Sequence, residues 1–261
     1  MKKNYKFKRI INSMGEYIIS ILFFIIIWHL YVKISNVPTY VLPSPGIVME
    51  QLLELFSSGT IYPHLLVTSM EVIIGFIIGA FLGIVLGYFI VKSSTLKYAL
   101  MPYLVFAQTA PKIALVPLFV IWFGIGLVSK IILIVSMVIF PVMMGIITGI
   151  DSIPEDSRNL MKILKSSPSQ ILFQLELPYS LPALFSSFKI GIVQAVIGAI
   201  VAEWISGKQG LGYILTYASS TYNTPMLIAG IVVTIVVGVI TYELIALIEN
   251  KLLYWHESKT F

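Results

Sequence analysis

The chain has 261 residues, of which 58% are apolar and only 11% are charged. Soluble domains carry about 25% charged residues, so this composition indicates an integral membrane protein and excludes an ordinary soluble domain. The absence of cysteine excludes disulfides and thiolate metal sites. The net charge of +5 lies mostly at the ends of apolar runs, which is the distribution expected of membrane topology and argues against nucleic-acid binding.

Six apolar runs have the length that a membrane-spanning helix needs, roughly 20 residues. They cover residues 17–36, 65–91, 98–122, 128–150, 181–204 and 224–248. A basic segment precedes the first run and no small-residue cleavage site follows it, so we expect a retained signal-anchor. The sequence therefore predicts an all-α integral membrane protein with six transmembrane helices.

Lysine and arginine are concentrated on one side of these spans. Twelve of them lie before span one, after spans two and four, and in the C-terminal tail, whereas Lys33, Lys130 and Lys208 lie on the other side. An excess of basic residues marks the cytoplasmic side of a membrane protein. Both termini and the segment 151–178 are therefore expected to face the cytoplasm.

Residues 151–178 form the longest polar interruption between apolar spans. Ser152 with Glu155, and Ser167 with Gln170, have the spacing of a capping box, and a proline lies near the first helical position of each. We therefore expect two short amphipathic helices joined by a turn. Such a hairpin on the membrane surface is expected to be a docking element.

Span three is expected to be irregular because Pro111 and Pro117 break the helical ladder. Irregular backbone at that depth is tolerated only where it is buried in protein or lines a wet cavity. Lys112 lies in this stretch, and an ionisable residue there suggests a function. It either meets an anionic substrate, or it snorkels or pairs with a carboxylate of the bundle. The candidate substrate pathway is Gln108, Lys112, Gln194 and Glu203.

Small residues at a spacing of four predict close packing of helices. Span two has glycine at every fourth position, which places these residues on one face where another helix can approach closely. Similar faces on spans five and six lead us to expect a tight core of spans two, five and six. The packing residues are Gly75, Gly79, Gly83, Gly87, Gly191, Gly230 and Gly238. Glu71 is expected to be solvated or paired at the interface.

The sequence contains no constellation that indicates an enzyme. It has no His/Asp/Glu cluster with metal-ligand spacing, no nucleophile elbow and no G-x-x-x-x-G-K-[ST] phosphate loop. We expect no catalytic residue, metal or cofactor, and a transport subunit. A secondary transporter driven by an ion gradient would also explain the spans and the broken helix. It would not explain the capped hairpin, and it usually needs internal repeats, which we do not find.

Several stretches resemble the permease subunits of bacterial ABC importers, in the binding-protein-dependent transport inner-membrane family. That family has a cytoplasmic Glu-Ala-Ala, a Gly, and a Leu-Pro about a dozen residues later. Counted back from Leu177-Pro178, these positions fall on residues 159–161 and on Lys165, and the signature residues are absent. The taurine, alkanesulfonate and nitrate branch, with its thiamine-precursor and riboflavin members, is similar at LPSP (42–45), AQTAPKIALVPLFVIWFGIG (107–126), AEWISGKQGLGY (202–213) and TYNTP (221–225).

The resemblance implies a type I importer permease in the bacterial cytoplasmic membrane, with a coupling-helix hairpin between spans four and five. It divides the chain into a basic lead, first span and external segment (1–60), a permease core (61–250) with the hairpin at 151–178, and a cytoplasmic tail (251–261). The residues it places at the ATPase are Glu155, Asp156, Arg158, Asn159, Leu160, Met161, Ile163, Leu164 and Lys165.

The same resemblance implies the partners and the substrate class. The expected partners are the lipid bilayer, two copies of a cytoplasmic ABC ATPase that supplies the energy, a second permease copy in a homodimer, and an extracytoplasmic substrate-binding protein. The substrate would be a small organic solute imported by alternating access. Both a sulfonate-, taurine- or nitrate-like anion and a thiamine-pyrimidine- or riboflavin-like heterocycle remain open.

Overall fold

A computed structural model describes residues 19–253, with Ser206 described by its backbone alone. Every regular element among these residues is a helix, which confirms the predicted all-α class. The chain divides into two compact units. One contains the residues up to Ile61 together with Ile214–Val232, and the other contains Tyr62–Tyr213 together with the residues from Val233 onward.

The smaller unit contains the loop that joins the first described helix to α2. Its elements are the helix Ile19–Ile34, α2 (Pro45–Ser57), most of α10 (Leu211–Ser220) and the first turns of α11 (Thr224–Leu252). Pro45 starts α2, where the missing N–H is not needed for a helical hydrogen bond. The Thr224 hydroxyl donates to the Tyr40 carbonyl oxygen at 2.5 Å and so ties α11 to the loop.

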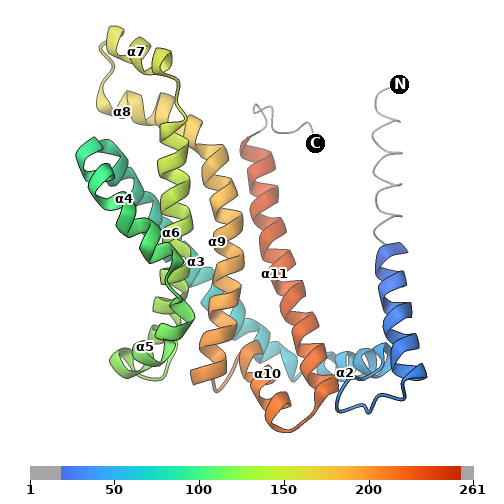
Figure 1. Cartoon of the computed structure of the whole chain (residues 1–261). Helices are drawn as coiled ribbons and strands as arrows, with labels where there is room; N and C mark the ends of the chain where they lie inside the picture. Colours follow the sequence, from blue (N-terminus) through green and yellow to red (C-terminus); the bar gives the residue numbers. More distant parts are fainter. Residues whose placement is uncertain (1–18, 254–261) are drawn as a thin grey trace, which may run out of the picture. The chain divides into compact units, whose positions relative to one another are not determined.

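The larger unit holds the elements that matter for function. They are α3 (Ile61–Lys92), α4 (Ser94–Thr109), η1 (Lys112–Leu115), α5 (Val116–Phe123), α6 (Leu127–Asp151), α7 (Glu155–Ile163), α8 (Pro168–Ile171), η2 (Leu172–Glu176), α9 (Leu177–Ser206) and the rest of α11. Figure 1 shows α6 and α9 side by side, with α7 and α8 at one end and α5 at the other end of α6. Its apolar core joins α3, α6 and α9 through residues such as Val72, Val138 and Ala195.

Four described helices are long and apolar enough to cross a membrane, namely α3, α6, α11 and the continuous helix Pro168–Ile205. A fifth span is broken: α4 and the segment Lys112–Phe123 meet at an angle of 79°. The first predicted span is present as the shorter apolar helix Ile19–Ile34. Residues 17 and 18 of that predicted span lie outside the described residues.

The break in span three lies at Ala110 and Pro111, as the sequence predicted for Pro111. The prediction for Pro117 is wrong, because Pro117 lies in the first turn of α5. A proline is tolerated there since the N–H that it lacks has no helical acceptor. Pro102 lies inside α4 without ending it.

The hairpin differs from its prediction in two respects. The capping box at Ser152 is wrong: Ser152 caps the C-terminus of α6, its hydroxyl donates to the Gly149 carbonyl at 2.7 Å, and α7 starts after Pro154 without a side-chain cap. The second arm is not a separate short helix, because α8, η2 and α9 run on without a break. The capping box of Ser167 and Gln170 is confirmed, with both of its hydrogen bonds present.

The π-helical turn η2 follows from the Leu-Pro pair. Pro178 has no N–H, so the carbonyl of Gln174, four residues earlier, cannot receive its normal α-helical hydrogen bond. The proline ring would also clash with that carbonyl in a regular α-helix. A wider turn, Leu172–Glu176, precedes the proline and relieves this clash. The helix thereby continues through the position at which it would otherwise end.

Candidate docking hairpin and membrane pathway

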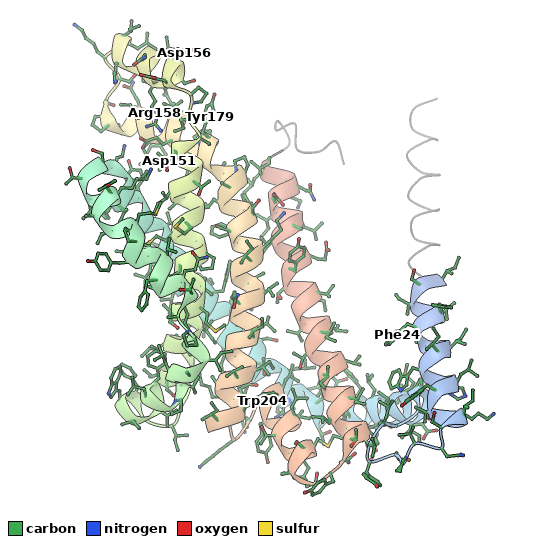
Figure 2. All side chains as sticks on the ribbon, viewed as in Figure 1. Phe24, Asp151, Asp156, Arg158, Tyr179 and Trp204 are labelled. Atoms are coloured by element: carbon green, nitrogen blue, oxygen red, sulfur yellow. The ribbon has the colours of Figure 1, made fainter. Side chains whose placement is uncertain are left out.

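The hairpin is fixed to the ends of the helices that carry it. The Arg158 guanidinium donates to the carbonyl oxygens of Ile150, in the last turn of α6, and of Ile153, which follows that helix. Lys97 of α4 pairs with Asp151 at 2.5 Å. Figure 2 shows Asp151, Arg158 and Tyr179 together at the base of the hairpin. α7 is therefore held at a defined place beyond the end of α6.

The turn after α7 is a Schellman motif in which lysine takes the position that glycine usually holds. The Ser166 N–H donates to the Met161 carbonyl and the Lys165 N–H donates to the Lys162 carbonyl, each at 3.0 Å. Lys165 has a φ of +49°, in the left-handed region. The chain therefore turns at Lys165 itself, the position that the spacing from Leu177-Pro178 assigned to glycine.

The predicted docking residues divide between two faces of α7. Leu160, Ile163 and Leu164 are 54%, 77% and 64% exposed, although they are apolar. Met161 packs against the core and Arg158 holds α6, so both are turned to the chain itself. The remaining docking residues are exposed or half-buried polar side chains, namely Glu155, Asp156, Asn159 and Lys165. We call Leu160, Ile163 and Leu164 the α7 patch.

The broken span opens a cavity of about 360 Å³. Three of the four predicted pathway residues line it: Gln108, Lys112 and Gln194. The Lys112 ammonium donates to the Gln108 carbonyl at 2.9 Å and lies 5.1 Å from the centre of the Phe140 ring. The other described lining residues, which include Pro141, are neutral, so no carboxylate there neutralises the lysine. The cavity therefore presents a cation and two amides.

Glu203, the fourth predicted pathway residue, lies outside this cavity and is 1% exposed. Its carboxylate accepts from the Thr68 hydroxyl at 2.7 Å and from the Gly212 N–H at 2.6 Å. Gly210 has a φ of +110°, and a Cβ there would lie 2.1 Å from the Glu203 Cδ. Glu203 thus closes the glycine-rich turn after α9 onto α3, and the glycines make room for its carboxylate.

A buried ion pair between Glu71 and Lys130 was missed from the sequence. Glu71 is 2% exposed and Lys130 is 6% exposed, and their charged atoms are 2.7 Å apart. Of the two alternatives expected for Glu71, solvation is therefore wrong and pairing is confirmed, and its partner Lys130 lies in the first turn of α6, within the predicted span four. The two residues are 59 positions apart, so no local pattern links them.

The glycines of α3 lie against α6. A Cβ at Gly75 would lie 2.4 Å from a side-chain atom of Ile134, and one at Gly87 would lie 2.3 Å from Ile146. A Cβ at Gly79 or Gly83 would lie 2.7 or 2.8 Å from atoms of the same helix. The second span therefore packs on the fourth, which corrects the expected core of spans two, five and six.

The other predicted packing glycines have different surroundings. A Cβ at Gly191 would lie 3.4 Å from Phe76 and Val138, an ordinary contact. Gly230 faces Leu215 within the smaller unit, at 2.8 Å. A Cβ at Gly238 would have nothing within 4 Å, so the prediction of close packing there is wrong for the described residues. α6 instead meets α9 closely at glycines of its own, Gly145 and Gly149.

Comparisons with known proteins agree with this geometry. The chain is 32% identical over 234 residues to a putative aliphatic sulfonates transport permease protein of Bacillus subtilis, covering 90% of this chain and 85% of that protein. It is 30% identical over 240 residues to a riboflavin transport system permease protein of Chloroflexus aurantiacus, covering 92% and 90%. It is 28% identical over 235 residues to the taurine transport system permease protein of Escherichia coli, covering 88% and 86%.

Solved structures show the same fold. A chain of the inward-facing MetNI methionine ABC transporter matches with a TM-score of 0.62 at 17% identity, over 72% of this chain and 95% of that one. A chain of an amino acid ABC transporter matches with a TM-score of 0.58 over 77% and 97%. The predicted type I importer permease fold is thereby confirmed. The sequence model of the family described as "binding-protein-dependent transport system inner membrane component" matches residues 75–254, and the chain belongs to that family.

Proposed function

We propose that this chain is the permease subunit of an ATP-driven ABC importer that carries a small organic solute into the cytoplasm. The observation that supports this best is the α7 patch: exposed apolar side chains on a short polar helix that Arg158 fixes to the end of α6. Exposed apolar groups that are held rigidly mark a surface for a partner. The sequence has no phosphate loop of its own, so the ATPase is a separate subunit.

The α7 patch would enter a groove on the ATPase, with Glu155 and Asp156 in the first turn of α7 setting its register. Burying one leucine or isoleucine side chain contributes about 1.5–3 kcal/mol of favourable free energy. The three side chains of the α7 patch would therefore together stabilise the complex with the ATPase. Two ATPase copies that close on ATP would move two hairpins, one from each permease of a homodimer. The spans would then rock as rigid bodies between inward- and outward-open states. An extracytoplasmic binding protein would deliver the solute.

The cavity of the broken span favours an anionic solute. It offers the Lys112 ammonium and the amides of Gln108 and Gln194, and no aromatic side chain is among its described lining residues. A flat heterocycle is usually held by aromatic surfaces, whereas an ammonium with amide donors suits a sulfonate or carboxylate oxygen. The Bacillus subtilis relative is named as a putative aliphatic sulfonates transport permease. We therefore infer a sulfonate-like solute.

The docking is tested by co-purifying the permease with its ATPase and measuring uptake in vesicles. Leu160→Asp and Ile163→Asp should abolish the complex and the uptake, because each buries a charge in an apolar groove. Ser169→Asp is the control, since it places the same charge on an exposed site of the other arm. Vanadate should stop uptake, whereas an ion-gradient transporter would respond to ionophores. Complex formation and uptake that survive both aspartate variants would contradict the proposal.

A further inference from the structure

Glu176 lies at the junction between the hairpin and α9 and is 5% exposed. Its two carboxylate oxygens accept from the Lys92 ammonium at 2.7 and 2.8 Å, and from the Tyr88 hydroxyl at 3.2 Å. Both donors belong to the last turns of α3. Lys92 and Glu176 are 84 positions apart in the sequence. A carboxylate with several charge-assisted hydrogen bonds is a strong and directional connection. The base of the hairpin is therefore tied to a helix that is not its neighbour in the chain.

The position of Glu176 within its helix adds to this. It is the last residue of the π-helical turn η2, and α9 begins at the next residue. A π-helical turn is a local departure from the regular helix and is frequently found at functional sites. The turn η2 sets the rotation of α8, the second arm of the hairpin, relative to α9. The carboxylate of Glu176, the last residue of this turn, is bound to α3. A movement of the arm thus reaches Glu176 before it reaches the membrane-spanning part of α9.

From α3 the connection continues into the bundle. The same helix lies against α6 along its glycine face, with less space than a Cβ needs at Gly75 and Gly87. Contacts this close move together, because a packed interface cannot be compressed. A displacement of the end of α3 at Lys92 would therefore shift α3 with α6.

We propose that Glu176 is the positioning residue that transmits the movement of the hairpin to α3, through Lys92 and Tyr88. This rests on the proposed function, in which the α7 patch docks on an ATPase. Glu176 belongs neither to the α7 patch nor to the described lining of the cavity at Lys112. Its loss should therefore uncouple ATP hydrolysis from transport and leave docking in place.

The experiment uses the complete complex with its ATPase and binding protein in vesicles. Glu176→Gln and Lys92→Met should leave complex formation unchanged and lower the solute imported per ATP by about tenfold, within the usual range of coupling between two sites. Combined, the two substitutions should lower it no further than either alone, because they break the same connection. Glu249→Gln is the matched control: it breaks a 2.7 Å ion pair to Lys189 between α9 and α11, and should leave the ratio unchanged.

Exchanging the partners gives the decisive measurement. Lys92→Glu with Glu176→Lys should restore at least part of the import per ATP, which a merely structural role for either side chain would not do. An unchanged ratio in Glu176→Gln, or no recovery in the exchange, would overturn the proposal. If Glu176→Gln fails to fold, Lys92→Met decides, because the Lys92 side chain is 41% exposed. If Leu160→Asp has no effect on the complex, the proposed function has failed. If Leu160→Asp breaks the complex but Glu176→Gln leaves the solute imported per ATP unchanged, only the role proposed for Glu176 has failed.

Discussion

The ammonium of Lys112 contacts two neutral groups, the Gln108 carbonyl oxygen and the Phe140 ring. Both attract a cation, and neither neutralises it. We therefore expect the lining of the cavity to keep a positive charge with which an anionic solute could pair. This charge lies beside the break of span three, where the backbone departs from the helix at Ala110 and Pro111.

Replacing Lys112 with methionine should weaken the uptake of an anionic solute. Taurine and an aliphatic sulfonate are the probes, and the apparent KM should rise by about tenfold, which corresponds to roughly 1.4 kcal/mol of lost charge attraction. Lys112→Arg keeps the charge and should stay within a few-fold of the native KM. An unchanged KM in Lys112→Met would place the solute elsewhere in the bundle.

Replacing Lys165 with glycine should stabilise the protein. A non-glycine residue in the left-handed region costs about 1 kcal/mol, and Lys165 has a φ of +49°. The midpoint of thermal unfolding in detergent should therefore rise for Lys165→Gly. Lys165→Ala removes the charge and keeps the unfavourable φ, so it should bring no such rise. Equal effects of the two substitutions would show that the charge matters and the backbone does not.

At the scale of single residues, the sequence was informative where polarity stood out against an apolar background. Gln108, Lys112 and Gln194 were selected in this way, and one cavity brings them together. Their role in transport stays a prediction. Glu203 stood out by the same criterion but binds Thr68 and Gly212 instead. Polarity alone does not tell a side chain that faces a cavity from one that satisfies a neighbouring backbone.

Among the helices, the glycine face of α3 packs closely against α6. Gly87→Ala should destabilise the protein by about 1–3 kcal/mol, the usual cost of overpacking, since its Cβ would lie 2.8 Å from the backbone oxygen of Met143. A backbone atom cannot move aside as a side chain can. Gly238→Ala on α11 is the control, because its Cβ would enter open space.

Thermal unfolding of the purified protein in detergent measures both variants. Gly238→Ala should be neutral or slightly stabilising, because alanine is the better helix former. Similar losses at Gly87 and Gly238 would contradict the interface with α6.

The limits of sequence reasoning at this scale have physical causes. A spacing of four fixes which face of α3 is small, but every helix of the bundle is apolar, so the spacing does not say which helix fills that face. The Ser152 and Ser167 patterns are alike, and only the second is a capping box. The difference is that α6 runs on to Asp151, so that the Ser152 hydroxyl is taken by a carbonyl of the helix that is ending.

For the whole molecule, composition and apolar run lengths were enough to predict an all-α membrane protein, and the family match and fold comparisons agree. The long spans came out well because hydropathy acts over many residues. The Glu71–Lys130 pair did not, because two charges far apart in sequence meet only once the bundle is packed. Long-range pairing is the part of the fold that local patterns carry least.

The predicted orientation is tested with single cysteines, since the chain has none of its own. Lys165→Cys and Lys208→Cys both lie at exposed positions. A membrane-impermeant maleimide applied to intact cells should label Lys208→Cys and leave Lys165→Cys unlabelled until the cells are opened. The opposite result would invert the topology and place the hairpin outside.

The continuous helix Pro168–Ile205 has 38 residues. At 1.5 Å per residue it is about 57 Å long. A bilayer with its headgroups is roughly 40–45 Å thick, so the helix exceeds it even when tilted by about 20°. This helix, which comprises α8, η2 and α9, is thus longer than one membrane crossing needs, and Figure 1 shows that its α8 end runs at an angle to α9. In the predicted orientation we expect the surplus residues to lie on the cytoplasmic side, which would place the turn at Lys165 and α7 where a soluble partner can reach them.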